Sequence, residues 1–168
     1  FNPVALNINN STISGYAALY FKAADGSKGS AGSVINVVNS TLEGINNAGQ
    51  DESNSFSTIM IEDDNIKINV DSTSTVKATT SNGNGQCIVG FGNELVTSLI
   101  SGCELTFAGV IDLDGEHTSY VGCSSYQGGI GNNTVKFAAK YADELEAEGW
   151  IVGESTDGLV TIAEEVAQ

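Results

Sequence analysis

Apolar and polar residues alternate along the first half of the chain with a period of two. The alternation is clearest at Leu6, Ile8, Ala17, Leu19 and Phe21. Successive side chains of a β-strand point to opposite faces, so this period is typical of strands with one buried face. Runs rich in Asn, Ser, Thr and Gly interrupt it, and we therefore expect short strands joined by polar bends and loops.

One part of this pattern occurs twice with almost no change. Residues 6–15 read LNINNSTISG and residues 35–44 read INVVNSTLEG, so that Asn39 follows Asn10 by 29 residues (39 − 10). A looser copy at residues 68–76 has one extra residue before its last apolar position, and residues 100–105 keep only the five-residue step between apolar positions. A period of this length is typical of repeat proteins, in which each unit buries its apolar face on its neighbours.

Two all-β folds agree with the alternation. In a parallel β-helix-like coil the chain advances by one sheet spacing per turn, which would stack Asn10 on Asn39 in an amide ladder and Ile13 on Leu42. An antiparallel sandwich also has alternating strands, but it gives no reason for the near-identity of NSTISG and NSTLEG. We therefore predict a coil of parallel strands over residues 1–127.

The pattern changes after residue 129. Asn133 and Thr134 are suited to cap a helix that ends near Gly149. Its apolar residues follow the 3.6-residue spacing at Phe137, Ala138, Tyr141, Ala142 and Leu145. Two short apolar runs, 150–152 and 159–162, then flank Asp157-Gly158, which is a hairpin signal. We expect residues 128–168 to form a helix-and-hairpin cap of the same domain, closing one end of the coil.

The charge of the chain is strongly one-sided. It has 21 Asp and Glu against 6 Lys and no Arg, for a formal net charge of −15. Such a field repels nucleic-acid backbones and anionic lipid surfaces, so we expect neither as a partner. No apolar run approaches the ~18 residues of a membrane span. The first residue is Phe rather than Met, which is typical of a processed or excised segment, and we expect an extracellular or cell-surface location.

The sequence contains three cysteines, Cys87, Cys103 and Cys123. Their odd number allows one disulfide and one free thiol in an oxidising compartment, while small buried thiols in core positions are the other interpretation. No two of them are spaced as CxxC, which argues against a structural zinc site.

Three acidic residues follow one another at every second position, Asp112, Asp114 and Glu116. In an extended segment they would project to the same side, and hard oxygen ligands arranged in this way can hold Ca²⁺. The segment lacks the length and spacing of an EF-hand loop. We nevertheless predict these three residues as the metal ligands if the chain binds a metal, with Ca²⁺ as the ion.

Catalysis has little support in the sequence. Asp63 with Asp64, or Asp112 with Asp114, are the carboxylate pairs that hydrolysis would need. Neighbouring carboxylates are more often solvated turn residues, and His117, the single histidine, has no Ser or Cys nucleophile motif near it. We predict no catalytic residue, no cofactor-binding residue and no enzymatic activity.

The closing segment resembles a known family. It contains GGIGNN at 128–133, Tyr141, EGWIV at 148–152 and DGLVTI at 157–162. This order is similar to the end of pectate-lyase-like right-handed β-helices from secreted surface proteins of Gram-positive, often gut-dwelling bacteria, although Trp150 and Val160 stand where that family usually has tyrosines. The resemblance implies a right-handed coil and a secreted or surface module, in some members an enzyme acting on acidic polysaccharide. A lyase of that kind would use an arginine near Ca²⁺, and this chain has no arginine.

Four tyrosines suggest a second function. Tyr16 and Tyr20 share the face opposite to Phe21, and together with Tyr120 and Tyr126 they would form a strip on which sugar rings stack if all four point outward on neighbouring turns. Scattered tyrosines are also ordinary on the surface of an extracellular β protein. Glycan binding is therefore the alternative prediction.

We predict an extracellular, non-enzymatic module with a structural or adhesive role. The repeat, and the absence of a cap before Leu6, indicate a homo-oligomer that forms by stacking of edges or ends, as in a filament or a layer. The alternative is a β-helix that binds or cleaves glycans. An enzyme would need a concave, charged cleft along one face, whereas a structural subunit would need complementary ends or edges.

Overall fold

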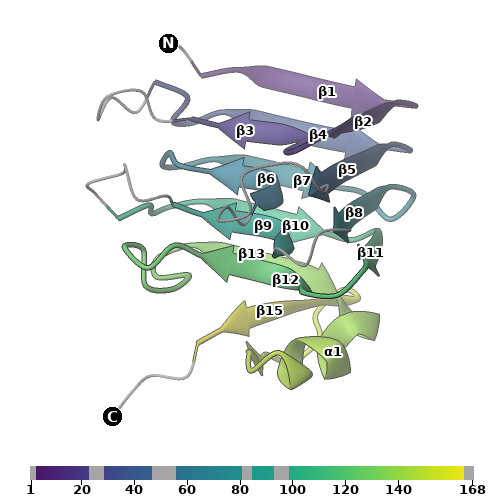
Figure 1. Cartoon of the computed structure of the whole chain (residues 1–168), viewed down its shortest axis with the longest axis vertical. Helices are drawn as coiled ribbons and strands as arrows, with labels where there is room; N and C mark the ends of the chain where they lie inside the picture. The colour runs from purple at the N-terminus through teal and green to yellow at the C-terminus, as the bar shows by residue number, and fades with distance from the viewer. Residues whose placement is uncertain (1–2, 23–28, 47–55, 81–84, 93–98, 165–168) are drawn as a thin grey trace.

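The chain folds into a parallel β-solenoid with three sheets, seen in the computed structural model of residues 3–22, 29–46, 56–80, 85–92 and 99–164 (Figure 1). Each coil contributes one strand to each sheet. The strands of the four coils are β1 (Ala5–Asn9), β2 (Thr12–Gly15) and β3 (Leu19–Phe21); β4 (Val34–Val38), β5 (Thr41–Asn46) and β6 (Phe56–Ile61); β7 (Lys67–Val70), β8 (Thr75–Thr80) and β9 (Gln86–Phe91); β10 (Glu104–Phe107), β11 (Val110–Asp114) and β12 (Thr118–Cys123).

Strands of successive coils pair in parallel and in register. The order is β1-β4-β7-β10 in the first sheet, β2-β5-β8-β11 in the second and β3-β6-β9-β12 in the third. Ala5 pairs with Val34, Val34 with Lys67, and Lys67 with Glu104, so the coils are 29, 33 and 37 residues long (34 − 5, 67 − 34, 104 − 67). The predicted parallel coil is confirmed, and the antiparallel sandwich is excluded.

The predicted ladders are present at the bend between the first and second sheets. The side-chain amide Nδ2 of Asn39 donates to Oδ1 of Asn10 at 2.7 Å, and Ile13 lies opposite Leu42. Both asparagines have a left-handed backbone, with φ of 50° at Asn10 and 46° at Asn39. Asparagine adopts this conformation more readily than most residues, which explains why the bend repeats the same residue.

The fourth coil has a different register from the one that its apolar spacing suggested. The step from Ile100 to Leu105 is not the repeated one, because Leu105 pairs with Ile68 and Ile111 pairs with Val76. The bend between β10 and β11 is shortened to Ala108 and Gly109. A Cβ on Gly109 would lie 2.0 Å from the carbonyl oxygen of Ser74, so only glycine allows the backbone to pass this closely.

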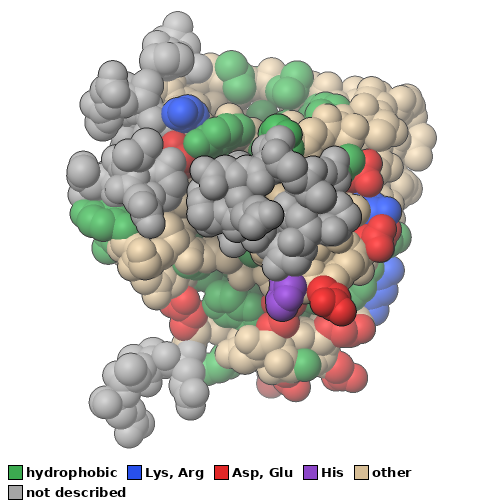
Figure 2. All heavy atoms as spheres, viewed as in Figure 1, with side chains coloured by type: hydrophobic (Ala, Val, Ile, Leu, Met, Phe, Trp, Pro, Cys, Tyr) green, Lys and Arg blue, Asp and Glu red, His purple; other side chains and the backbone are tan. Residues whose placement is uncertain are grey.

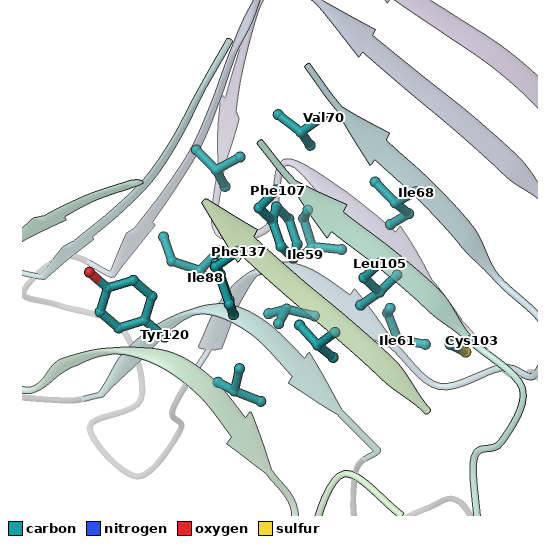
Figure 3. Packing of buried hydrophobic residues seen from close by; sticks show 14 of the residues in the cluster. Ile59, Ile61, Ile68, Val70, Ile88, Cys103, Leu105, Phe107, Tyr120 and Phe137 are labelled. Carbon is teal, nitrogen blue, oxygen red and sulfur yellow. The ribbon is translucent and has the colours of Figure 1, made fainter. Parts of the chain in front are cut away.

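Inward-facing side chains of successive coils stack into one hydrophobic cluster that extends from Ile8 to Ile162. Figure 3 shows Ile68 beside Leu105 and Phe107 beside Phe137. The rings of Phe107 and Phe137 are stacked with centroids 5.1 Å apart, and Tyr120 meets Phe137 edge-on at 5.3 Å. Burial of these stacked side chains is the main stabilising contribution, because each removes its apolar surface from water.

The C-terminal cap contains one more strand and a shorter helix than predicted. Residues expected at the start of the helix form β13 (Thr134–Ala138), which pairs in parallel with β10. A helical turn, η1 (Ala139–Tyr141), and the helix α1 (Ala142–Ala147) follow. Val135 and Phe137 fit the two-residue spacing of a strand as well as a helix. The strand forms because pairing with the free edge of β10 buries both side chains completely.

The predicted hairpin is confirmed. It consists of β14 (Ile151–Val152) and β15 (Leu159–Ala163), which are antiparallel. Asp157 and Gly158 form the turn with φ of 53° and 77°, the positive values that suit a tight hairpin. β15 also pairs antiparallel with β13 and so ends the first sheet's parallel series. Within the described ranges, no helix is long and apolar enough to cross a membrane.

Candidate functional site

Two of the residues predicted as calcium ligands lie together with a lysine. Asp112 on β11 pairs with Lys77 on β8, and Lys77 Nζ lies 3.7 Å from Asp112 Oδ2 and 3.1 Å from Asp114 Oδ2. Glu43 Oε1 lies 3.9 Å from the same nitrogen. The hydrogen bond with Asp114 is the main reason that the pKa of Lys77 is raised, so the lysine stays charged and partly neutralises the carboxylates.

The third predicted ligand, Glu116, takes no part in the ion pairs of Lys77. Glu116 is exposed in the turn between β11 and β12 and makes no ion pair within the described part of the chain. Among the residues that the structure describes, no group of three or more His, Cys, Asp and Glu side chains is arranged to hold a metal ion. Calcium binding by Asp112, Asp114 and Glu116 stays a prediction. Lys77 was missed as a partner of these carboxylates because the contact depends on the register of β8 and β11.

The other predicted carboxylate pair has a structural role. Asp63 is buried, and its Oδ2 accepts hydrogen bonds from the backbone N–H of Ser30 at 2.7 Å and from its hydroxyl at 2.6 Å. Asp64 Oδ1 accepts one from the N–H of Ser101 at 3.0 Å. The two side chains therefore tie the corner between β6 and β7 to the coils before and after it.

His117 and the cysteines match the less reactive interpretation. His117 is exposed in the turn before β12 with φ of 63°, where its carbonyl accepts a hydrogen bond from Gln86. Cys87, Cys103 and Cys123 are free thiols. Burial raises the pKa of Cys103 to about 11 and that of Cys123 to about 12, so both stay protonated near neutral pH and are poor nucleophiles.

The four tyrosines do not form one strip. Tyr16 and Tyr20 are exposed on the first coil, and Tyr126 is exposed after β12, but Tyr120 is buried against Phe137. The Tyr20 hydroxyl donates to Glu62. The condition that all four tyrosines point outward fails at Tyr120, because β12 buries two neighbouring residues, Tyr120 and Val121, where regular alternation would bury one of the two.

One end of the solenoid is closed by the cap. The Tyr141 hydroxyl accepts a hydrogen bond from the N–H of Ile111 at 2.8 Å and donates to its carbonyl at 3.3 Å. Both carboxylate oxygens of Glu148 lie 3.1 Å from the N–H of Tyr120. Ile111 and Tyr120 lie on β11 and β12, the last strands of their sheets, so side chains of the cap satisfy backbone groups that would otherwise be unpaired.

The opposite end is open in the described part of the chain. Its edge strands β1, β2 and β3 are each the outermost strand of a sheet. Leu6 is 43% exposed, whereas Ile35 behind it in the same column is 1% exposed, and Val4 is 53% exposed. The inward-facing layer of the first coil is therefore only partly covered, since Ile8 and Phe21 are buried but Leu6 is not. We call β1, β2 and β3 with their side chains the open end.

The open end is uncharged. Residues 3–21 contain no Asp, Glu, Lys, Arg or His, in a chain whose formal net charge is −15. In Figure 2 the end that holds β1 presents mainly hydrophobic and uncharged polar side chains with one basic side chain nearby, and most acidic side chains in this view lie farther down the molecule. Natural edge strands usually carry charges or bulges that prevent pairing with other strands. β1 has neither charges nor a bulge. Pro3, just before β1, is the one nearby residue that would hinder pairing with another strand.

A shallow polar groove runs along the first bend. It has a volume of about 270 Å³ and is lined by Asn10, Ser11, Thr12, Asn39, Ser40, Thr41 and Thr73. The hydroxyls of Thr12 and Thr41 make no hydrogen bond to another described residue, and these threonines pair in register on β2 and β5. The groove thus presents neutral donors and acceptors at the regular spacing of the coils. The repeat was predictable from the sequence but the groove was not, because the groove depends on the stacking of two coils and on Thr73 from a third.

We compared the chain with protein-family models, with curated proteins and with solved structures, and none of them matched. The class that the structure defines is that of a parallel β-solenoid with one capped end.

Proposed function

We propose that this chain is a structural or adhesive module located outside the cell or on its surface, which associates with copies of itself through the open end. The observation that supports this is the contrast between the ends: one is sealed by cap side chains, whereas the other presents unpaired strand edges, exposed Val4 and Leu6, and no charge. Strand edges of this kind pair readily with other strands.

The location and the family are part of the same proposal. The resemblance of residues 128–162 to secreted surface β-helices, together with the acidic composition, supports an extracellular setting. A non-enzymatic role is supported by how the acidic residues are used: the oxygens of Asp63 and Asp64 accept hydrogen bonds from the backbone, and Lys77 pairs with Asp112 and Asp114.

Sedimentation of the full chain over a wide concentration range tests self-association. We expect the wild type to form oligomers as the concentration rises and the Leu6→Lys variant to remain monomeric, because the lysine places a charge in the contact. Ile151→Lys is the matched control, since Ile151 is exposed on β14 at the capped end. A wild type that is monomeric at all concentrations, or a Leu6→Lys variant that associates equally well, would contradict the proposal.

The groove supports glycan binding as a second candidate function. Hydroxyl and amide groups without charge are suited to the hydroxyls of a neutral saccharide. Calorimetric titration with neutral oligosaccharides selected on a glycan array should show binding by the wild type and loss of binding by the Thr12→Val, Thr41→Val double variant. Thr134→Val, at an exposed position on β13, is the control. Absence of any array signal would remove this candidate, and cleavage of a bound glycan would revive the enzymatic alternative.

A further inference from the structure

We propose that two copies meet at their open ends about a two-fold axis that crosses β1, so that association stops at a dimer. This inference rests on the self-association proposed above and specifies its partner and geometry. It predicts a dimer in place of the expected filament or layer, because one end of the solenoid is capped and the other is open.

Among the described residues, the capped end has a single short strand edge, that of the two-residue strand β14 (Ile151–Val152) in the first sheet. In the second and third sheets, backbone groups of Ile111 and Tyr120 on the last strands are already bonded to Tyr141 and Glu148. The open end of one copy can therefore extend all three of its sheets at once only with the open end of another. A contact between two identical surfaces is isologous, and it closes after two subunits.

The shape of the solenoid determines which strands would meet. All strands of a coil run in the same rotational sense, and a two-fold rotation reverses that sense, so every contact between the copies becomes antiparallel. An axis through the middle of β1 places β1 against β1 of the second copy. It also places β2 of each copy against β3 of the other, and these strands have four and three residues.

Side-chain alternation selects the register of the central pair. Antiparallel pairing keeps apolar side chains on the inner face only if the paired positions have the same parity. With Asn7 at the centre of β1, Leu6 lies opposite Ile8 of the second copy, and Asn7 lies opposite Asn7. The half-exposed Leu6 is then covered by the buried layer of the partner.

Asn7 is also the free end of a second amide ladder. Asn69 Nδ2 donates to Asn36 Oδ1 at 3.0 Å, and Asn36 Nδ2 donates to Asn7 Oδ1 at 3.0 Å. The Nδ2 of Asn7 has no acceptor among the described residues, and its Oδ1 has a second lone pair. Two Asn7 side chains across the axis would each donate to the other, so the ladder continues through the contact.

The distribution of charge favours this arrangement. Two chains of net charge −15 repel each other, and head-to-head contact brings together the segments, residues 3–21, that carry no charge. It also directs the acidic caps, including Glu144 and Glu148, away from each other. A cap-to-cap contact would instead bring these carboxylates together.

A charge exchange at Asn7 tests the two-fold axis. Asn7→Asp and Asn7→Lys each place like charges directly opposite each other, and we expect either variant alone to dimerise about tenfold more weakly or worse. An equimolar mixture should recover wild-type dimerisation, because opposite charges then meet across the axis. Sedimentation equilibrium gives the dissociation constants, and circular dichroism confirms that each variant is folded.

Ser14→Asp and Ser14→Lys are the matched controls. Ser14 is exposed on β2, which meets β3 of the second copy and not itself, so mixing these two variants should have no special effect. If the wild type associates but the mixture of Asn7 variants shows no recovery, or if oligomers larger than a dimer grow with concentration, the two-fold contact is wrong while self-association stands. If the wild type never associates, both proposals fail.

Discussion

Single polar side chains hold the corners of this solenoid. Asn10 and Asn39 provide the left-handed bend of the first two coils. In the third coil Asp71 lies at the corresponding bend, and its Oδ1 accepts hydrogen bonds from the N–H of Asn39 at 3.4 Å and from the hydroxyl of Ser74 at 2.6 Å. The hydrogen bond from Ser74 is the main cause that lowers the pKa of Asp71. At the closed end Glu148 has the corresponding role.

Glu148 gives a prediction for the pH dependence of stability. Burial of its carboxylate is the main cause that raises its pKa, against the lowering effect of the Tyr120 N–H. A carboxyl group whose pKa is higher in the folded state binds its proton more tightly there, so its contribution favours folding at low pH and is lost as the pH rises through the raised pKa. The Glu148→Gln variant stays neutral at this position. Its free energy of unfolding should therefore rise relative to that of the wild type when the pH is raised from 4 to 7.

Urea denaturation of both proteins at the two pH values measures this difference. Glu148→Ala is the comparison variant, because it leaves the N–H of Tyr120 without its acceptor, and it should lower the free energy of unfolding by about 1–3 kcal/mol. An equal stability difference between Glu148→Gln and the wild type at both pH values would show that the carboxyl group titrates normally.

Sequence repetition revealed one of the two amide ladders. Asn10 and Asn39 stand in near-identical words, so their stacking followed from the repeat. Asn7 and Asn36 share the second position of the same two repeats, and Asn69 follows in the looser copy, so the repeat also contains the second ladder, which was not predicted. The contact of Lys77 with Asp112 was not predicted, because it depends on a register across two coils that share few identical residues.

At the scale of the elements, pairing with an existing edge outweighed local preference. The parallel strands of the first three coils were predictable, since their apolar columns repeat at nearly constant steps. Residues 134–138 fit a helix by spacing, but the free edge of β10 made them a strand. The register of the fourth coil was missed because its bend is shortened at Gly109, and a shortened bend leaves no apolar signal.

Gly109 therefore gives a prediction about the register. Gly109→Ala should lower the free energy of unfolding by about 1–3 kcal/mol or more, because the added Cβ would lie 2.0 Å from the Ser74 oxygen and 2.6 Å from the Asp71 oxygen, both in the backbone. Gly153→Ala is the matched control, since its Cβ would come no closer than 3.3 Å to a neighbouring atom. Equal stability of the two variants in urea denaturation would mean that the bend relaxes without loss.

At the scale of the whole molecule, the two ends of the solenoid differ in chemistry. The cap is acidic and satisfies the backbone groups of the last strands, whereas the first coil is uncharged and its apolar layer is partly exposed. The difference between the ends could be recognised in full only from the folded structure. The sequence indicated an open edge before Leu6, but it did not show that Tyr141 and Glu148 would seal the other end.

The net charge gives a prediction for ionic strength. Association of chains that each carry −15 should tighten several-fold when NaCl is raised from about 10 mM to about 100 mM, because the Debye length falls from about 30 Å to about 10 Å and the repulsion is screened. Sedimentation at both salt concentrations measures the dissociation constant. Weaker association at the higher salt concentration would indicate that ion pairs hold the copies together, contrary to an uncharged contact.

The coiled path of the chain also determines how the protein responds to a pulling force. β1 and β15 lie at opposite ends of the solenoid, and the strands lie across its long axis (Figure 1). Tension between the two ends therefore peels strands from the stack one after another instead of shearing all their hydrogen bonds at once. Each released coil of 29 to 37 residues adds about 100 Å or more of extended chain. Under load the molecule would lengthen in discrete steps at modest force, which is the behaviour of an extensible tether.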